Sequence, residues 1–221
     1  FLGEDAENFK GVWADDGARY ALHLELDLDE IVPVVSAPHN VDNVKAVAEV
    51  AGVHVMEGLI GTCTNGRIED LRIAASVLSG RKIKEGFQLN VIPASDKVFL
   101  QALNEGLITI LVEAGASILP PSCGPCLGTG LGIPASGHTV ISTANRNFLG
   151  RMGNKEASIY LASPATVALS AINGVITDPR TEADDRKFPF SVSQSATSSI
   201  SGGENRRSGN VWNYSDVDNL N

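Results

Sequence analysis

Apolar residues recur along this chain with two spacings, one typical of strands and one typical of helices. Residues 20–27 (YALHLELD) alternate apolar and polar positions, as a half-buried strand does. Residues 41–51 (VDNVKAVAEVA) have helical spacing, and they are followed by Gly52, a residue type that commonly closes a helix. Residues 53–60 (VHVMEGLI) predict a second strand.

The same alternation continues to residue 178. A helix is predicted after residue 67, because Ile68, Leu71, Ala75 and Leu78 share one face, and it ends at Gly80. The remaining segments predict strands at 88–94, 116–120, 138–145 and 158–163, and helices at 97–106 and 165–173 with Asp96 and Ser163 as N-caps. This alternation predicts an α/β domain of three layers, αβα, with a mostly parallel sheet and helices on both faces.

Composition divides the chain into four parts. We assign residues 1–19 to the end of a preceding segment and residues 20–180 to the α/β domain. Residues 181–209 are charged and then rich in Ser and Gly, which predicts a disordered linker. Residues 210–221 (NVWNYSDVDNLN) bring back Trp and Tyr, which predicts the truncated start of another domain. The sequence lacks an initiator Met and a helix stop signal at its end, so we expect a fragment of a longer chain.

Charge and composition narrow the classes of function. The net charge of −9 and the pI of about 4.9 argue against binding to nucleic acid or to anionic lipid. No apolar run approaches the roughly 20 residues of a membrane span, and the N-terminus has no signal-peptide pattern. The three cysteines are too few, and odd in number, for a secreted disulfide framework. We therefore expect a cytoplasmic protein without a membrane partner.

Three loops carry the candidate chemistry. Cys63 lies in GTCTNGR, Cys123 and Cys126 lie in PPSCGPCLG, and STANRNFLGR contains Asn145, Arg146 and Arg151. Each loop follows a predicted strand, and ligands of parallel sheets bind where strands end. The three loops are therefore expected to converge on one edge of the sheet. Arginines there suit substrate carboxylates, although ion pairing on an acidic surface is the alternative for an isolated loop.

The cysteine spacing leaves four interpretations open. A redox dithiol needs only Cys123 and Cys126 and leaves Cys63 unexplained. Zinc usually takes four protein ligands, and the nearest histidine, His138, lies 12 residues beyond Cys126 (138 − 126). In the third interpretation, the three cysteines are buried and pack as small apolar residues. A [4Fe–4S] cluster would use all three thiols and leave one iron free to accept a substrate oxygen as a Lewis acid.

Four segments of the chain, in order, resemble the aconitase superfamily. They are GTCTNGRIEDLRIAA, PPSCGPCLGTGLG, STANRNFLGRMG and YLASPATVALSAINGVITDP. The TNGRIEDLR form is closer to the isopropylmalate isomerase (3-isopropylmalate dehydratase) large subunits and the homoaconitases than to aconitases proper. The resemblance covers about residues 20–180 and implies the family's third domain, which carries the cluster. Residues 210–221 resemble the start of the swivelling fourth domain or of the small subunit.

The resemblance implies a [4Fe–4S] hydro-lyase that dehydrates and rehydrates a hydroxy di- or tricarboxylic acid, as in leucine biosynthesis. It implies that Cys63, Cys123 and Cys126 bind the cluster, and that Asn145, Arg146 and Arg151 contact the cluster or the substrate carboxylates. Asn65 is a weaker candidate, since an Asn before Gly66 also suits a turn. Homoaconitase, aconitate hydratase, a nucleic-acid-binding module and a redox dithiol protein are the alternatives.

The family's catalytic base and acid come from other domains. We therefore expect no catalytic residue in this fragment and no turnover by the fragment alone. We also expect the remaining domains, or a small subunit, as its partners. The sequence leaves open which hydroxy acid is the substrate.

Overall fold

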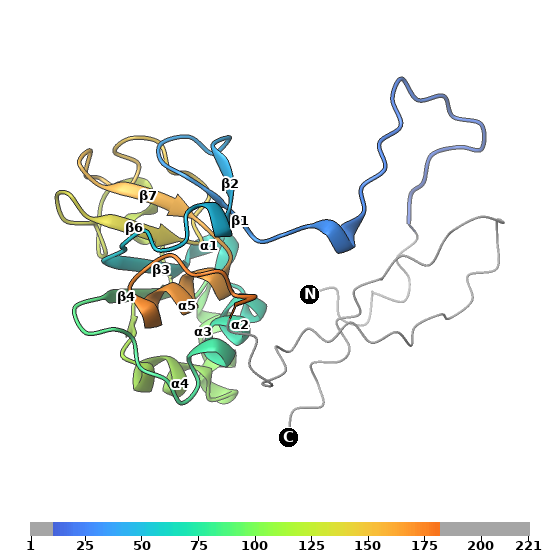
Figure 1. Ribbon diagram of the computed structural model, residues 1–221. Coiled ribbons are helices and arrows are strands. Elements are labelled where there is room, and N and C mark those ends of the chain that lie inside the picture. Colours follow the sequence, from blue (N-terminus) through green and yellow to red (C-terminus); the bar gives the residue numbers. More distant parts are fainter. Residues whose placement is uncertain (1–10, 182–221) are drawn as a thin grey trace. The chain divides into compact units, whose positions relative to one another are not determined.

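The structure is a computed structural model and describes residues 11–181 (Figure 1). The chain divides after Ile31 into two units. Every residue from 11 to 31 is exposed, and the only regular element there is the 3-10 helix η2 (Leu28–Glu30). The strand predicted at 20–27 is therefore wrong. Its alternating pattern is present, with Leu22 and Leu24 exposed, but no described strand pairs with its backbone, and a strand requires such a partner.

The second unit contains a seven-stranded sheet with the order β2-β1-β7-β6-β3-β4-β5. The strands are β1 (Val34–Ser36), β2 (Val44–Ala46), β3 (Glu57–Gly61), β4 (Gln88–Ile92), β5 (Ser117–Ile118), β6 (Thr139–Ser142) and β7 (Ser158–Leu161). Strands β3 to β7 are mutually parallel where they pair, whereas β1 runs antiparallel to β2 and β7. The prediction of an α/β domain with a mostly parallel sheet is confirmed.

The helix predicted at 41–51 is wrong. This segment forms β2, in which Val44 lies opposite Ser36, and then the 3-10 helix η3 (Val47–Glu49). The valines recur every third residue, a spacing that suits a 3-10 turn as well as an α-helix. Pairing with β1 favours the strand, because it gives hydrogen-bond partners to backbone groups that a short isolated helix would leave without partners.

One face of the sheet is covered by four helices. They are α2 (Ile68–Leu78), α3 (Asp96–Asn104), α4 (Leu107–Ala114) and α5 (Pro164–Asn173). Figure 1 shows them gathered beside β3 and β4. Their apolar faces pack with Ile60, Leu89 and Ile141 of the strands into the larger core cluster. The sequence analysis did not predict α4, because six of its eight residues are apolar and only Thr109 and Glu113 mark a polar side.

The opposite face has a different cover. Leu59, Val140 and Ile159 alternate with the residues of the larger cluster and therefore point to this second face. Cys126, from the 3-10 turn η4 (Gly124–Leu127), and Met152 pack on them. Within the described part of the chain, turns and loops cover this face, so the predicted second layer of helices is not formed there.

Side-chain caps set the helix starts. Ser163 accepts the N–H of Thr166 at the start of α5, as predicted. Helix α3 is capped by Ser95, which accepts the N–H of Val98, and not by Asp96 as predicted. Asp96 is the first helical residue, where its charge favours the positive end of the helix dipole.

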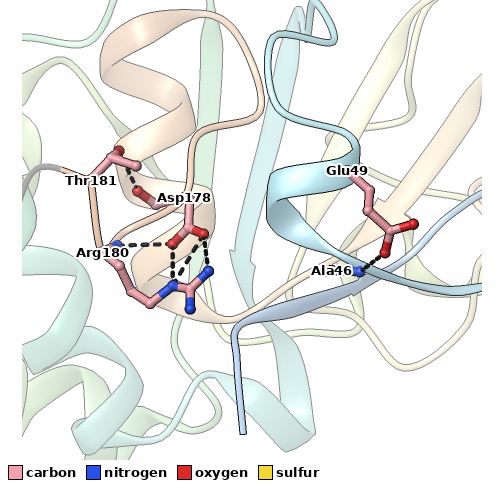
Figure 2. Close-up of polar contacts among 5 residues, drawn as sticks. All are labelled: Ala46, Glu49, Asp178, Arg180 and Thr181. Atoms are coloured by element: carbon pink, nitrogen blue, oxygen red, sulfur yellow. Dashed lines mark hydrogen bonds and ion pairs between the residues drawn. The ribbon is translucent and has the colours of Figure 1, made fainter. Parts of the chain in front are cut away.

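The described part ends in a tight polar turn (Figure 2). Asp178, with 4% of its surface exposed, accepts hydrogen bonds from the backbone N–H of Arg180 at 2.9 Å and from Nη2 of the same residue at 2.7 Å. These contacts hold the pKa of Asp178 below its ordinary value. The same view shows Glu49 accepting the Ala46 N–H at 2.8 Å, which closes the first turn of η3.

Several expectations concern residues beyond this part. The linker predicted at 181–209, apart from residue 181, and the domain start predicted at 210–221 lie outside the described residues. Among residues 11–181 there is no helix of the length and apolarity that a membrane crossing requires.

Candidate functional site

The loop that carries Cys63 leaves the end of β3 under backbone strain. Gly61 has φ 122°, and a Cβ atom there would overlap the carbonyl group of Ile92, the last residue of β4. Thr62 is buried at φ 71°, a conformation that costs a β-branched residue about 1–3 kcal/mol. Cys63 follows within the short helix α1 (Thr62–Asn65), and its thiol is exposed and free. Strain of this kind gathers at functional sites, and here it lifts a thiol to the surface.

The second cysteine loop packs on Ile92, at the end of the neighbouring strand β4. Cys126 lies within the turn η4 and is buried, Cys123 is the N-cap of that turn and is exposed, and both are free thiols. The N–H of Cys126 donates to the carbonyl of Cys123 at 3.0 Å, which closes the turn. Gly124 has φ 51°, and a Cβ atom there would overlap the side chain of Ile92. Gly61, which leads into the Cys63 loop, and Gly124, beside Cys123, therefore both lie against Ile92 at the carboxyl edge of the parallel strands.

The loop after β6 brings arginines to this edge. Arg151 donates from Nη2 to the sulfur of Cys126 at 3.5 Å, and its guanidinium lies 5.4 Å from the ring centre of Phe148. Its Nε is buried and has no hydrogen-bond partner in the structure. Arg146 is exposed and donates from Nη1 to the carbonyl of Asn145 at 3.1 Å, so most of its donors face solvent. One arginine supports a cysteine and the other is open to a ligand.

A fully buried residue fixes this arginine loop. Asn147 donates from Nδ2 toward the carbonyls of Ala37 at 2.9 Å and of Ser36 and Ile159 at 3.2 Å. The bonds tie the loop to β1 and β7, and the Asn147 oxygen has no partner. Sequence reasoning missed this residue, because an Asn between Arg146 and Phe148 carries no signal of burial. Such a clamp pre-organises the neighbouring side chains.

The Cys63 loop and the arginine loop are joined directly. Asn65 donates from Nδ2 to the backbone carbonyl of Thr143, and to the Asn145 oxygen at 3.2 Å. Asn145 donates in turn from its own Nδ2 to the Thr64 hydroxyl at 2.9 Å. The structure therefore brings Asn65 and Asn145 together, and it shows Asn65 as a bridge between loops. Thr64 was not expected from the sequence, although its place directly after Cys63 was the available signal.

A hollow of about 400 Å³ opens beside this bridge. Its lining residues are Thr64, Asn65, Arg67, Glu69 and Asp70. Asp70 accepts the N–H of Arg67 at 3.0 Å, which closes the start of α2. Burial raises the pKa of Asp70 above its ordinary value. The hollow thus mixes amide, hydroxyl and ionisable groups next to an exposed thiol.

The cysteine geometry bears on the kind of metal group. Among the residues that the structure describes, no three His, Cys, Asp or Glu side chains lie close enough to hold a single metal ion. A [4Fe–4S] cube is bound at separate iron corners, so its thiols stand farther apart. Three free thiols on glycine-bearing loops, with a guanidinium on Cys126, fit an anionic cluster.

The fold and this edge define an α/β domain whose cysteine and arginine loops share one end of a parallel sheet. The chain belongs to the aconitase family: the family described as aconitase (aconitate hydratase) matches residues 43–174.

Similar proteins agree with this assignment. The chain is 56% identical over 179 residues to the 3-isopropylmalate dehydratase large subunit 2 of Archaeoglobus fulgidus, which covers 81% of this chain and 43% of that protein. It is 52% identical over 174 residues to the 3-isopropylmalate dehydratase large subunit of Elusimicrobium minutum, covering 79% and 42%. The corresponding protein of Clostridium beijerinckii is 51% identical over 166 residues, covering 75% and 40%. The chain thus spans less than half the length of these relatives.

Proposed function

We propose that Cys63, Cys123 and Cys126 hold a [4Fe–4S] cluster. The observation that carries this proposal is the meeting of both cysteine loops at Ile92, with Arg151 donating to the Cys126 sulfur. The Arg151 hydrogen bond fixes the Cys126 sulfur beside the candidate site. The chain has only three cysteines, so a cube bound here keeps one iron without a thiolate.

The function that this site supports best is that of a hydro-lyase acting on a hydroxy di- or tricarboxylic acid. When bound, the cluster supplies a Lewis acid for the hydroxyl group that leaves. The open guanidinium of Arg146 binds a substrate carboxylate, and Asn145 donates an N–H beside it. Arg151 stays with Cys126 and holds its sulfur in place. The names of the relatives favour 3-isopropylmalate, and hence leucine biosynthesis, over homocitrate or citrate.

Such a reaction also requires a base for the α-proton and an acid for the departing hydroxide. We infer that these groups come from regions of the protein that this chain does not span and from a small subunit, since the relatives are named large subunits and are more than twice as long as the matched segment. The 221-residue chain is therefore expected to bind the cluster but not to turn over substrate. The acidic charge argues against a nucleic-acid partner, and three free thiols suit the reducing cytoplasm.

Anaerobic reconstitution with iron and sulfide tests the cluster. The chain should turn brown, absorb broadly near about 400 nm and hold about three to four irons. Cys63→Ser should abolish this absorbance, as should Cys126→Ser, while Ser79→Ala at the far end of α2 should leave it unchanged. A redox dithiol protein would keep its Cys123–Cys126 exchange activity in Cys63→Ser. Unchanged iron content in that variant would refute the cluster proposal.

The substrate is tested on the complete protein with its partner. Side-by-side kinetics on 3-isopropylmalate, homocitrate and citrate should give the highest kcat/KM for 3-isopropylmalate. A preference for either of the other two acids would move the assignment to another branch of the family.

A further inference from the structure

We infer that Thr64 and Asn65 are positioning residues that turn the carboxamide of Asn145 so that it offers an N–H donor to the candidate site. This inference rests on the proposed function for what is bound, but its geometry stands on this chain alone. Neither residue is assigned to contact substrate or iron. They act through Asn145, from the two positions that follow Cys63.

The orientation of the Asn145 carboxamide is set by a backbone carbonyl, which cannot exchange its acceptor for a donor. The carbonyl of Thr143, in the backbone just after β6, can only accept a hydrogen bond. Asn65 therefore turns its Nδ2 toward that carbonyl, and the same Nδ2 faces the Asn145 oxygen at 3.2 Å. If the carboxamide of Asn145 were reversed, two NH₂ groups would face each other. The Thr143 backbone thus sets Asn65, and Asn65 sets Asn145.

The other end of the Asn145 carboxamide is held as well. Its Nδ2 donates to the Thr64 hydroxyl at 2.9 Å. That hydroxyl also lies 3.6 Å from the sulfur of Cys63, so the clamp reaches the expected cluster ligand. One residue pair therefore couples the cysteine on the β3 loop to the amide on the β6 loop. A displacement of either loop would therefore displace the other loop through these hydrogen bonds.

The clamp leaves Asn145 with a definite chemical character. Its oxygen is engaged by Asn65, and one of its two N–H groups is engaged by Thr64. The second N–H is uncommitted, and Asn145 is exposed at the sheet edge. A fixed donor suits an acceptor without protons, such as a carboxylate or a cluster sulfide, and discriminates against a donating group. The clamp thus selects hydrogen-bond acceptors, such as carboxylates, at this point of the site.

NMR of the 15N-labelled chain tests the clamp without any cluster. The Asn145 side-chain NH₂ signals, assigned by their loss in Asn145→Asp, should show one strongly shifted proton and slow exchange. Thr64→Val should collapse that shift, because the acceptor is removed without a change in size. Asn65→Asp should reverse the carboxamide, since a carboxylate would then face it. Asn154→Asp is the matched control, because Asn154 donates elsewhere, to the Pro134 carbonyl.

Anaerobic reconstitution adds a readout that depends on the cluster. In Thr64→Val and Asn65→Asp the iron content should stay near that of the wild type, while the EPR g-values of the reduced cluster shift. Asn154→Asp should match the wild type in both. The inference is overturned if the Asn145 signals are the same in wild type, Thr64→Val and Asn65→Asp. Failure of the wild type to bind a cluster would overturn the proposed function instead, while the NMR result would still decide the clamp.

Discussion

The two faces of the sheet are built by different means. Among residues 11–181, twenty-three buried residues, all aliphatic, pack between the strands and helices α2 to α5 on the helix-covered face. In the same described range, only seven buried residues form a cluster on the loop-covered face, and one of them is Cys126. Burial of apolar area is the main source of folding free energy, so the helix-covered face carries most of the stability.

The loop-covered face uses its residues for position. Left-handed or strained backbone conformations occur at Gly61, Thr62 and Gly124. The fully buried side-chain amide of Asn147 holds one loop in place. These features stabilise little by themselves, and they require a rigid sheet beneath them. The helix-covered face therefore serves as a scaffold held by apolar packing. The loop-covered face carries the candidate site, where the positions of individual side chains matter.

The largest expected effect comes from the scaffold face. Leu111→Ala removes a side chain of α4 that is fully buried in the larger cluster, so the free energy of unfolding should fall by about 2–5 kcal/mol. Val112→Ala on the same helix is the control, because Val112 is 53% exposed and should cost under about 1 kcal/mol. Urea unfolding measures both. The iron bound per folded molecule should stay the same in both variants. Loss of iron from fully folded Leu111→Ala would contradict the separate roles of the two faces.

The site face should respond in the opposite way. Gly124→Ala adds a methyl group that overlaps the Ile92 side chain, in a backbone conformation that already disfavours Ala by about 1 kcal/mol. The expected result is a loss of about 1–3 kcal/mol and a displaced Cys123–Cys126 turn, with weaker iron retention during dialysis. Gly130→Ala shares the positive φ, but a Cβ atom there has room, its nearest contact being 3.7 Å away. Equal iron retention in the two variants would show that the contact with Ile92 does not position the cysteines.

The same contrast explains how far the sequence alone could lead. Helices α2 and α5 follow from their apolar period, and the convergence of the three loops follows from parallel strands. Helix α4 was missed because six of its eight residues are apolar, so its two polar residues, Thr109 and Glu113, set only a weak period. The exposed segment at 20–27 has a strand pattern, but pattern alone does not supply a backbone partner.

At the site, the motifs predicted the residue types and the structure added their connections. Asn145, Arg146 and Arg151 were expected as one group, yet Arg151 lies against Cys126 while Arg146 faces solvent. Local sequence could not separate them, since the difference arises from a contact between loops 25 residues apart. The roles of Asn147 and Asn65 depend on carbonyl groups that are distant in sequence, which no local pattern encodes.

The smallest expected effects are electrostatic, and two carboxylates should give opposite signs. Contact with Arg180 lowers the pKa of Asp178, so its stabilisation is present above the unfolded pKa of about 3.9 and is lost as pH falls through the lower folded value. Burial raises the pKa of Asp70, so its charged form destabilises the fold at neutral pH, and this cost disappears as pH falls through the raised value.

Asparagine substitutions isolate these two contributions. At pH 7 Asp178→Asn should be slightly less stable than the wild type, whereas Asp70→Asn, which can still accept the Arg67 N–H, should be equally or more stable. The Asp70 difference should shrink as pH falls through the raised pKa of that carboxyl, and the Asp178 difference only at lower pH, as pH falls through its lowered pKa. Urea unfolding at pH 7, 5 and 3 measures the trend. If Asp70→Asn were the more destabilised of the two at pH 7, the capping bond at the start of α2 would outweigh burial, and α2 would depend on its charged cap at the site edge.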